Sequence, residues 1–451
     1  MLDSSSPWRR DLAALLRLTG PVAAARLGVM AMGLTDALVV GRYSAEQLGY
    51  QALGWTLPAV AMVGAMGFLS GVQVMTARYL GQGRPDLTGG VFRRGLAYAL
   101  ALGLGMGALL IALGPAVLHA FRLAPGLADG ASAPMRVFAA SLPAILVASC
   151  AGQFLEASGK AGVSMAVMWI ANLVNLGLDL LLVPGTLGLP ALGAVGSGWA
   201  TFGARAFLAA ALLAHILRMK SARSLGLFDR VSDGPAAAAE QRRLGYGAGV
   251  SQLVESAAFS GMNLVVGAIS ALTVAGWAVV LNLTAIVFMT PLGMSTACAV
   301  LVGRAYGARD EAGVRRAAIL GFCLAAAYGV VVAALVIPLR WAIAGAYTTD
   351  PALLATAGAA LGLAALFFCP DAVQVVAAQA LRARGDVLAP TLTHIASYAL
   401  VMLPLGWLLA VRLHHGLNGA VLAVILASLM SAGLLLGRFG MLDRPPKPPR
   451  T

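Results

Sequence analysis

The chain has 451 residues, of which 60% are hydrophobic and only 11% are charged. An ordinary soluble domain has about a quarter of its residues charged, so this composition excludes a soluble enzyme, a disordered chain and a collagen. Spans of about 20 apolar residues with short loops allow about twelve membrane helices in this length. We therefore expect an all-α polytopic membrane protein with no separate soluble catalytic domain.

The formal net charge of +13 does not indicate nucleic-acid binding, because the basic residues fall between apolar runs and not on one polar surface. Most of the 31 Lys and Arg residues lie on the side of the membrane that also holds both termini. By the positive-inside rule, both termini are expected in the cytoplasm. The four cysteines lie far apart in apolar runs, so neither a disulfide nor a metal site is predicted.

Apolar runs between charged and Gly/Pro clusters predict twelve spans in two sets of six. The first set is expected near residues 17–41, 48–77, 95–118, 134–155, 161–184 and 192–217. The second set is expected near residues 244–269, 275–302, 317–345, 352–381, 387–411 and 416–437.

An internal repeat supports this division. The pattern QxLxAxG at Gln153–Gly159 returns at Gln379–Gly385, and Gly193-Ala194-Val195 returns as Gly419-Ala420-Val421, both at an offset of 226 residues. Six spans per half is an even number, so the two halves insert the same way up, as parallel repeats do. The predicted organisation is a lobe over residues 1–217, a basic cytoplasmic linker over 218–243, a second lobe over 244–437 and a cytoplasmic tail over 438–451.

No GxxxxGK[ST] phosphate loop is present, so ATP is not the predicted energy source. Four carboxylates lie well inside apolar runs: Asp36, Asp179, Glu255 and Asp371. A charged side chain at membrane depth costs several kcal/mol and usually marks an ion or substrate pathway. These residues are therefore the main candidates for binding a coupling ion.

In the amino half, Asp36 and Asp179 each lie about 8 Å from the outer end of a span, at 1.5 Å of rise per residue. Asn175 and Thr201 add oxygen atoms near the same depth. Two carboxylates, a carboxamide and a hydroxyl suit Na⁺ or a shared proton. The alternative interpretation is a hydrogen-bonded polar plug between helices.

In the carboxy half, Glu255 and Asp371 both fall near the membrane midplane, and Pro370 bends the helix and frees carbonyl groups beside Asp371. Gln252 and Asn282 are expected to complete this ion or drug site, and packing or capping is the alternative. A cavity wall suited to organic cations is predicted from nearby aromatic and sulfur side chains, namely Phe259, Phe288, Phe367 and Met32.

At these residues the sequence resembles the multidrug and toxic compound extrusion (MATE) family, in its bacterial NorM-type branch. The resemblance is carried by Leu34–Gly41, Asn175–Asp179, Pro291–Ser295 and Pro370-Asp371, together with Glu255 and the paired QxLxAxG. It implies two six-helix lobes in the bacterial inner membrane that export cationic drugs and dyes in exchange for Na⁺ or H⁺. It also implies ion-coupling roles for the amino-half set and for Glu255 and Asp371.

The resemblance leaves the coupling ion open, because NorM-type members often have Tyr where this chain has Phe367, and Asp179 is closer to the proton-using branch. No cofactor beyond the coupling ion is expected, and the expected partners are small organic cations and the lipid bilayer, with the protein acting as a monomer. The alternative function is a flippase for a lipid-linked precursor of the same superfamily, which usually has about fourteen spans and a basic cavity. A major-facilitator transporter and a membrane enzyme are disfavoured, because GxxxDRxGRR and HExxH are both missing.

Overall fold

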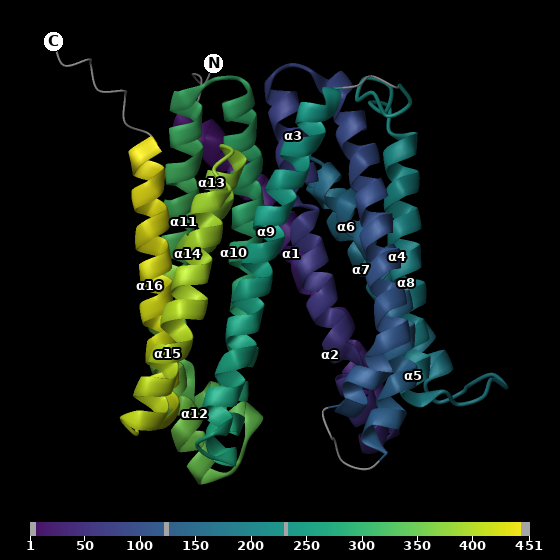
Figure 1. The fold of residues 1–451 in the computed structure, drawn as a ribbon, viewed down its shortest axis with the longest axis vertical. Coiled ribbons are helices and arrows are strands. Elements are labelled where there is room, and N and C mark those ends of the chain that lie inside the picture. Colours follow the sequence, from purple (N-terminus) through teal and green to yellow (C-terminus); the bar gives the residue numbers. More distant parts are fainter. Residues whose placement is uncertain (1–5, 121–125, 230–232, 443–451) are drawn as a thin grey trace, which may run out of the picture. The chain divides into compact units, whose positions relative to one another are not determined.

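The computed structural model describes residues 6–120, 126–229 and 233–442, and within these ranges the chain is helical without any β-strand (Figure 1). The first half contains α1 (Pro7–Tyr43), α2 (Ala45–Phe68), α3 (Ser70–Gly81), η1 (Pro85–Leu87), α4 (Thr88–Ala120), α5 (Leu127–Ala140), α6 (Leu142–Ala157), α7 (Ala161–Leu182) and α8 (Gly193–Arg218). The second half contains α9 (Gly234–Gly267), α10 (Ala271–Gly307), α11 (Glu311–Tyr347), α12 (Pro351–Ala364), η2 (Ala365–Phe367), α13 (Phe368–Ala383), α14 (Leu388–His394), η3 (Ile395–Met402), α15 (Leu403–Gly406), η4 (Trp407–Arg412) and α16 (Gly416–Leu442).

The helices confirm the predicted all-α membrane architecture. Eleven helical segments in the described ranges are long and apolar enough to cross a membrane. One predicted span, 244–269, is not among these eleven. It lies in α9, which is long enough to cross a membrane. Its hydropathy is lowered by Ser251, Gln252, Glu255, Ser256, Ser260 and Asn263. Polar residues concentrated on one spanning helix indicate that this helix faces other protein groups.

The repeat appears in the helix ends. Ser44 caps α2 by accepting a hydrogen bond from the Gln47 N–H, and Ser270, 226 residues later, caps α10 by accepting one from Thr273. The QxLxAxG pattern ends each helix in the same way, because Gly159 and Gly385 have φ of 78° and 95°. Only glycine adopts this left-handed conformation without steric cost.

The predicted span at 387–411 is helical throughout but is not a regular α-helix. The α-helical turns of α14 give way to π-helical turns in η3 and η4, on either side of α15. Pro404 in α15 has no N–H to donate, so the regular backbone hydrogen bonding is interrupted there. Such π turns occur frequently at functional sites.

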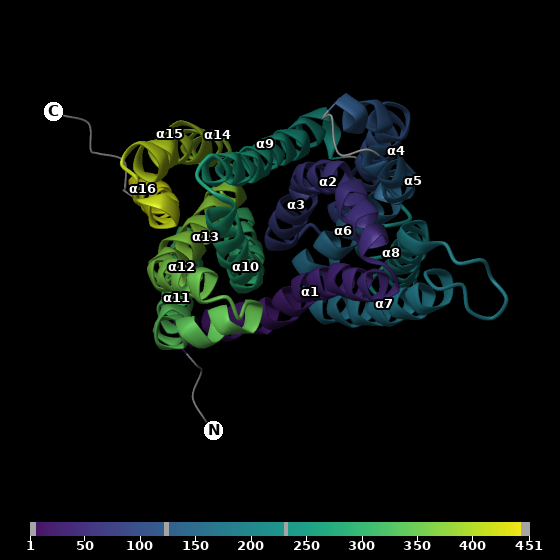
Figure 2. The same ribbon diagram turned by 90° about the horizontal axis from the view of Figure 1, so that it is seen from below.

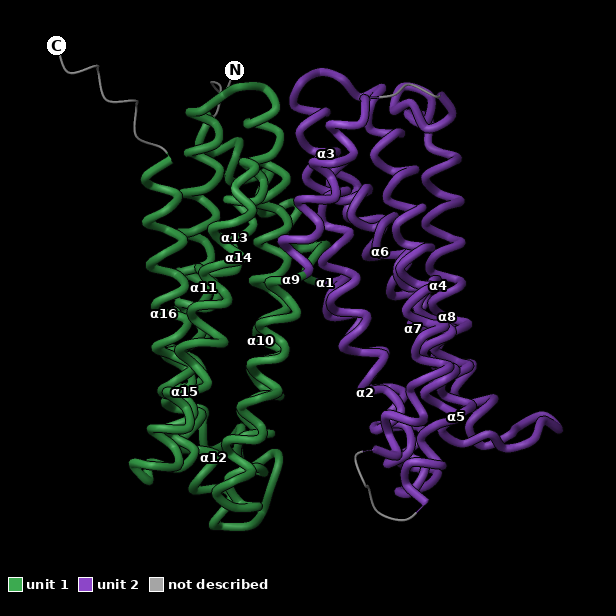
Figure 3. Tube along the Cα trace, viewed as in Figure 1, with its two compact units in different colours: residues 1–23, 250–451 green, residues 24–249 purple. Residues whose placement is uncertain are grey.

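The chain forms two compact units, residues 24–249 and residues 1–23 with 250–451 (Figure 3). The division falls inside α1 and inside α9, whereas the sequence predicts lobe boundaries at residues 217 and 244. Each unit is a bundle of long helices that run beside one another (Figures 1 and 2). We call residues 24–249 the amino unit and the other set the carboxy unit.

Much of the predicted linker is folded against the amino unit, and α9 begins within it at Gly234. The Gly89 N–H donates to the Leu225 carbonyl at 2.7 Å, and the Arg93 guanidinium donates to the carbonyls of Gly226 and Leu227. Gly226 has φ of 63°, and a Cβ there would overlap the Asp86 carbonyl oxygen. Residues 230–232 of the linker and 443–451 of the predicted tail lie outside the described residues.

Asp233, just before α9, anchors the end of this segment. It accepts hydrogen bonds from the Arg94 guanidinium at 2.5 and 2.7 Å and from the Tyr79 hydroxyl at 2.8 Å. Burial opposes the charge on this carboxylate, but these hydrogen bonds outweigh it and hold the pKa of Asp233 below its ordinary value. The junction with α9 is therefore fixed to α3 and α4.

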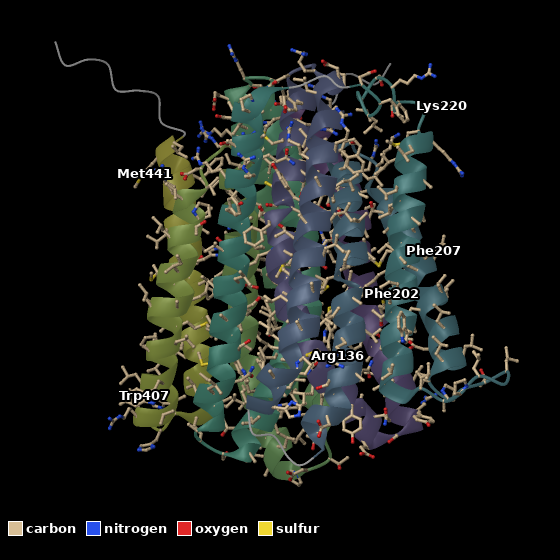
Figure 4. The ribbon with its side chains drawn as sticks, turned by 45° about the vertical axis from the view of Figure 1, so that its right-hand side comes forward. Arg136, Phe202, Phe207, Lys220, Trp407 and Met441 are labelled. Atoms are coloured by element: carbon tan, nitrogen blue, oxygen red, sulfur yellow. The ribbon has the colours of Figure 1, made fainter. Side chains whose placement is uncertain are left out.

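Large apolar side chains cover the outside of the helices. On α4, Leu100, Leu104, Leu109 and Leu113 are 46–61% exposed, and Phe207 on α8 and Trp407 on η4 are exposed as well (Figure 4). Exposed apolar surface on this scale requires a nonpolar surrounding. It is the surface that a lipid bilayer covers.

Candidate functional site: two carboxylate clusters

The amino unit brings together all four residues that the sequence assigned to its ion site. Asp36 on α1 is 5% exposed and accepts two hydrogen bonds. The Asn175 amide donates to Oδ1 at 2.9 Å, and the Thr201 hydroxyl donates to Oδ2 at 2.7 Å. Each carboxyl oxygen of Asp36 therefore has one neutral hydrogen-bond donor.

Asp179 completes this cluster and differs from Asp36 in its partners. It lies one helical turn after Asn175 on α7, is fully buried, and has no hydrogen-bond partner on either carboxyl oxygen. Asp36 and the Ser197 hydroxyl are its polar neighbours. Burying an unpaired ionised carboxylate is very costly, so Asp179 suits a bound proton or a bound cation.

Sequence reasoning missed a cationic residue beside this cluster. Arg205, one turn after Thr201 on α8, is buried at 6% exposure. Its guanidinium donates to the Ser141 hydroxyl at 2.7 Å and lies 4.9 Å from the Trp55 ring centre. It also interacts electrostatically with Asp36. The spacing of four residues between Thr201 and Arg205 was the sequence feature that could have indicated a place for Arg205 beside this cluster.

A further buried carboxylate was also missed. Glu156, inside the first QxLxAxG pattern on α6, is 4% exposed and lies 3.8 Å from the Arg26 guanidinium on α1. The pair shows that Arg26 is neutralised inside the amino unit.

The carboxy unit joins its two predicted carboxylates through a residue that was not predicted. The Gln374 amide on α13 donates to Glu255 Oε1 at 3.4 Å and to Asp371 Oδ1 at 3.3 Å. Asp371 is 4% exposed and Gln374 is fully buried. The spacing of three residues from Asp371 to Gln374 places both on one helix face, which was the available signal.

Two further side chains surround Glu255. His394 Nδ1 on α14 lies 3.9 Å from Glu255 Oε2, and the buried Arg382 on α13 interacts electrostatically with Glu255. The His394 ring also contacts Tyr398 edge-on, at 5.7 Å between centres. This cluster therefore holds two carboxylates, one guanidinium, one amide and one imidazole.

Other predicted site residues lie outside these contacts. Asn282 on α10 is exposed and donates to the Ala278 carbonyl of its own helix at 2.9 Å, and Gln252 and Phe288 are partly exposed. Phe367 is packed in the core at 3% exposure, Met32 is buried, and Phe259 packs on Tyr398. In this structure the packing of Phe367 and Met32 leaves little of either side chain for a cavity wall.

Neither cluster has the composition of a site for a resident transition metal. Within the described ranges no group of three or more His, Cys, Asp and Glu side chains is placed to hold a metal ion. Cys150, Cys298, Cys323 and Cys369 are all free thiols. The chemistry available is the exchange of protons or small cations on buried carboxylates.

Comparison with known proteins identifies the family. The family model MatE matches the chain twice, over residues 21–181 and 248–408, once in each half of the repeat. The chain belongs to the MatE family. It is 55% identical to a probable multidrug resistance protein NorM of Caulobacter vibrioides over 97% of this chain and 93% of that protein. It is 31% identical to the multidrug resistance protein PmpM of Pseudomonas aeruginosa, over 88% and 84% of the two chains.

Solved structures agree on the fold of this NorM-type member of the MATE family. A MATE crystal structure in a bent conformation superposes with a TM-score of 0.87 at 20% identity, covering 97% of this chain and 98% of that one. The eukaryotic MATE transporter AtDTX14 gives 0.87 at 17% identity, with 96% of both chains covered. The membrane-spanning helices and the NorM relatives together identify the protein as a multi-pass membrane transporter, as predicted.

Proposed function

We propose that this protein exports cationic or amphipathic organic compounds across the bacterial inner membrane in exchange for Na⁺ or H⁺. The observation that carries the proposal is the pair of buried carboxylate clusters, each with more acidic than basic groups. Several curated relatives are named as multidrug resistance proteins, which supports organic compounds as the cargo. The protein works as a monomer in the lipid bilayer with both termini in the cytoplasm.

The sign of the buried charge supports a cationic cargo. Counting Asp36 and Asp179 against Arg205, and Glu255 and Asp371 against Arg382, each cluster has one net negative charge when its carboxylates are ionised. One proton, one Na⁺ or one monovalent organic cation neutralises such a cluster. Because a buried net charge is costly, these cations compete for it, and competition between two ligands is reciprocal.

The fold alone does not select the cargo. A MOP superfamily transporter from Pyrococcus furiosus, with a TM-score of 0.84 and 19% identity, is described as having a binding pocket of reverse polarity that suggests a different function. A flippase for a lipid-linked precursor needs cationic groups to hold an anionic headgroup. Acidic clusters in both halves favour export of cations over that alternative.

Transport by purified protein in liposomes tests the proposal. An imposed pH gradient and an imposed Na⁺ gradient, applied separately, should drive a cationic dye such as ethidium in the direction opposite to the ion. One of the two gradients, or both, should act. Dye movement that responds to neither gradient would contradict exchange, and transport of an anionic lipid precursor would favour the flippase.

A further inference from the structure

The α9 and α14–η3 segments of the carboxy unit meet through three paired contacts. The Ser251 hydroxyl donates to the Thr391 hydroxyl oxygen at 3.4 Å, and one turn later Glu255 Oε2 faces His394 Nδ1 at 3.9 Å. A further turn along, the Phe259 and Tyr398 rings lie 6.1 Å apart. Figure 2 shows this part of α9 beside α14. The outer two contacts fix the register that brings Glu255 and His394 together.

His394 lies between the Ser251 backbone and the Glu255 carboxyl. The residue is 3% exposed, and the Ser251 backbone carbonyl is the hydrogen-bond acceptor nearest its ring. A neutral imidazole has one donor and one acceptor nitrogen. With the ring N–H directed to the Ser251 carbonyl, the other nitrogen is left as an acceptor, and Glu255 Oε2 faces the ring at 3.9 Å.

Glu255 lies between two partners of opposite kind. Its Oε1 accepts from the Gln374 amide at 3.4 Å, while Oε2 faces His394 at 3.9 Å. Both separations exceed an ideal hydrogen-bond length of about 2.9 Å, so a small side-chain rotation engages either one. An amide N–H serves an ionised carboxylate, whereas a protonated carboxyl has an O–H that needs an acceptor.

We propose that His394 is the hydrogen-bond acceptor for the protonated Glu255 carboxyl and is a positioning residue that favours H⁺ over Na⁺ at the carboxy-unit cluster. The inference rests on the proposed cation exchange. On protonation, Glu255 donates its O–H to the imidazole nitrogen, and on proton release it returns to the Gln374 amide. Na⁺ gains little from this arrangement, because hard cations prefer oxygen ligands to imidazole nitrogen.

The charged groups around the pair agree with a neutral imidazole. Asp371 and Arg382 approach from α13 and Tyr398 from η3, and α16 contributes the Ser428 hydroxyl, 3.4 Å from the Tyr398 hydroxyl. A second positive charge beside the Arg382 guanidinium is electrostatically unfavourable. The proton is therefore carried by Glu255, and His394 supplies the acceptor.

The first test measures equilibrium binding of tetraphenylphosphonium to purified protein across pH. In the wild type, acidification should weaken binding as protons occupy Glu255. His394→Phe keeps a ring of similar shape without an acceptor, so acidification should weaken binding only at a pH about one unit lower, a tenfold weaker hold on the proton. In this variant Na⁺ should compete more strongly with tetraphenylphosphonium, and the acceptor-bearing His394→Gln should restore the wild-type pH profile.

The second test does not depend on drug binding or on the Phe variant folding. The chain has five histidines, so ¹⁵N-histidine labelling gives few signals, and His394 is assigned by its absence in His394→Gln. The ¹⁵N chemical shift of its acceptor nitrogen should change with pH in the wild type. In Glu255→Gln it should stay at the value of a hydrogen-bonded nitrogen at every pH, because the amide introduced there always donates. The inference would be overturned by a His394 chemical shift that changes neither with pH nor in Glu255→Gln. A wild-type pH dependence of cation binding in His394→Phe would also overturn it. Failure of the wild type to bind the cation would instead contradict the proposed function.

Discussion

The two halves of the repeat place opposite charges at an equivalent position. Residue 156 and residue 382 occupy the same place in the two QxLxAxG patterns. In the amino unit this residue is Glu156, paired with Arg26 on α1. In the carboxy unit it is Arg382, which interacts electrostatically with Glu255 on α9. An acidic and a basic residue therefore interact between the equivalent helices of each half, with the signs exchanged.

The carboxylate clusters differ in the same way. Asp36 accepts hydrogen bonds from two donors, Asn175 and Thr201, whereas the polar neighbours of Asp179 are Asp36 and the Ser197 hydroxyl. Glu255 and Asp371 share one donor, Gln374, and Glu255 also faces the acceptor His394. The repeat thus preserves helix ends and packing positions, while each half has acquired its own ion chemistry. The predictions that follow test whether the two clusters have different tasks.

The largest effect is expected at Asp36. Asp36→Asn keeps the size of the side chain but removes its negative charge. Gradient-driven dye transport in liposomes should fall to background while expression and membrane insertion remain normal. Asp129→Asn is the control, because Asp129 is a solvent-exposed carboxylate. A folding defect in place of a specific transport defect would support the polar-plug interpretation.

The next largest effect is expected at the Arg26–Glu156 pair, and it is a loss of stability. Glu156→Gln should leave Arg26 without its counter-ion and lower the free energy of unfolding by about 2 kcal/mol, below the full cost of stranding a buried charge because Arg26 keeps some exposure. The exchanged double variant, Arg26→Glu with Glu156→Arg, should recover most of this loss. Thermal unfolding in detergent measures both. If the double variant loses as much stability as Arg26→Glu and Glu156→Arg lose in sum when each is made alone, the two positions do not interact.

Much of the architecture was predictable from the sequence because apolar runs and helix-ending glycines are local signals. Spacing along single helices and the rarity of charge in apolar runs were enough to predict the spans, the repeat and the amino-unit set of Asp36, Asn175, Asp179 and Thr201. Gln374, Arg205 and His394 were missed as site residues because their roles arise from contacts between helices distant in sequence. Asn282 shows the converse, since a polar residue at a suitable depth bonds its own helix.

A smaller effect is expected where the linker is anchored. Asp233→Asn should loosen residues 219–229, so trypsin should cut after Lys220 and Arg223 severalfold faster in inside-out vesicles. The pKa of Asp233 is lowered in the folded protein, so its contribution to stability is present above the ordinary aspartate pKa and is lost as pH falls through the lowered value. The protection of this segment against hydrogen exchange, relative to the intrinsic rate at each pH, should therefore fall on acidification in the wild type more than in Asp233→Asn. Cleavage only in right-side-out vesicles would contradict cytoplasmic termini.

The smallest effect is expected at Asn282. Its amide bonds its own helix and does not contact Glu255 or Asp371, so Asn282→Leu should change the initial rate of dye transport by less than about twofold, within the range of a neutral exposed substitution. Gln374→Leu provides the contrast, because it removes the donor that joins the two carboxylates. If both variants lose transport rate equally, Asn282 does take part in the carboxy-unit site.

The central claim is that both carboxylate clusters exchange an organic cation for H⁺ or Na⁺. Equilibrium binding of a cationic dye to purified wild type, Asp36→Asn, Asp371→Asn and the double variant, across pH and Na⁺ concentration, tests it most directly. Each single variant should weaken the dependence of dye binding on the ion, and the double variant should abolish it. Dye binding by the double variant that depends on the ion as in the wild type would contradict the account.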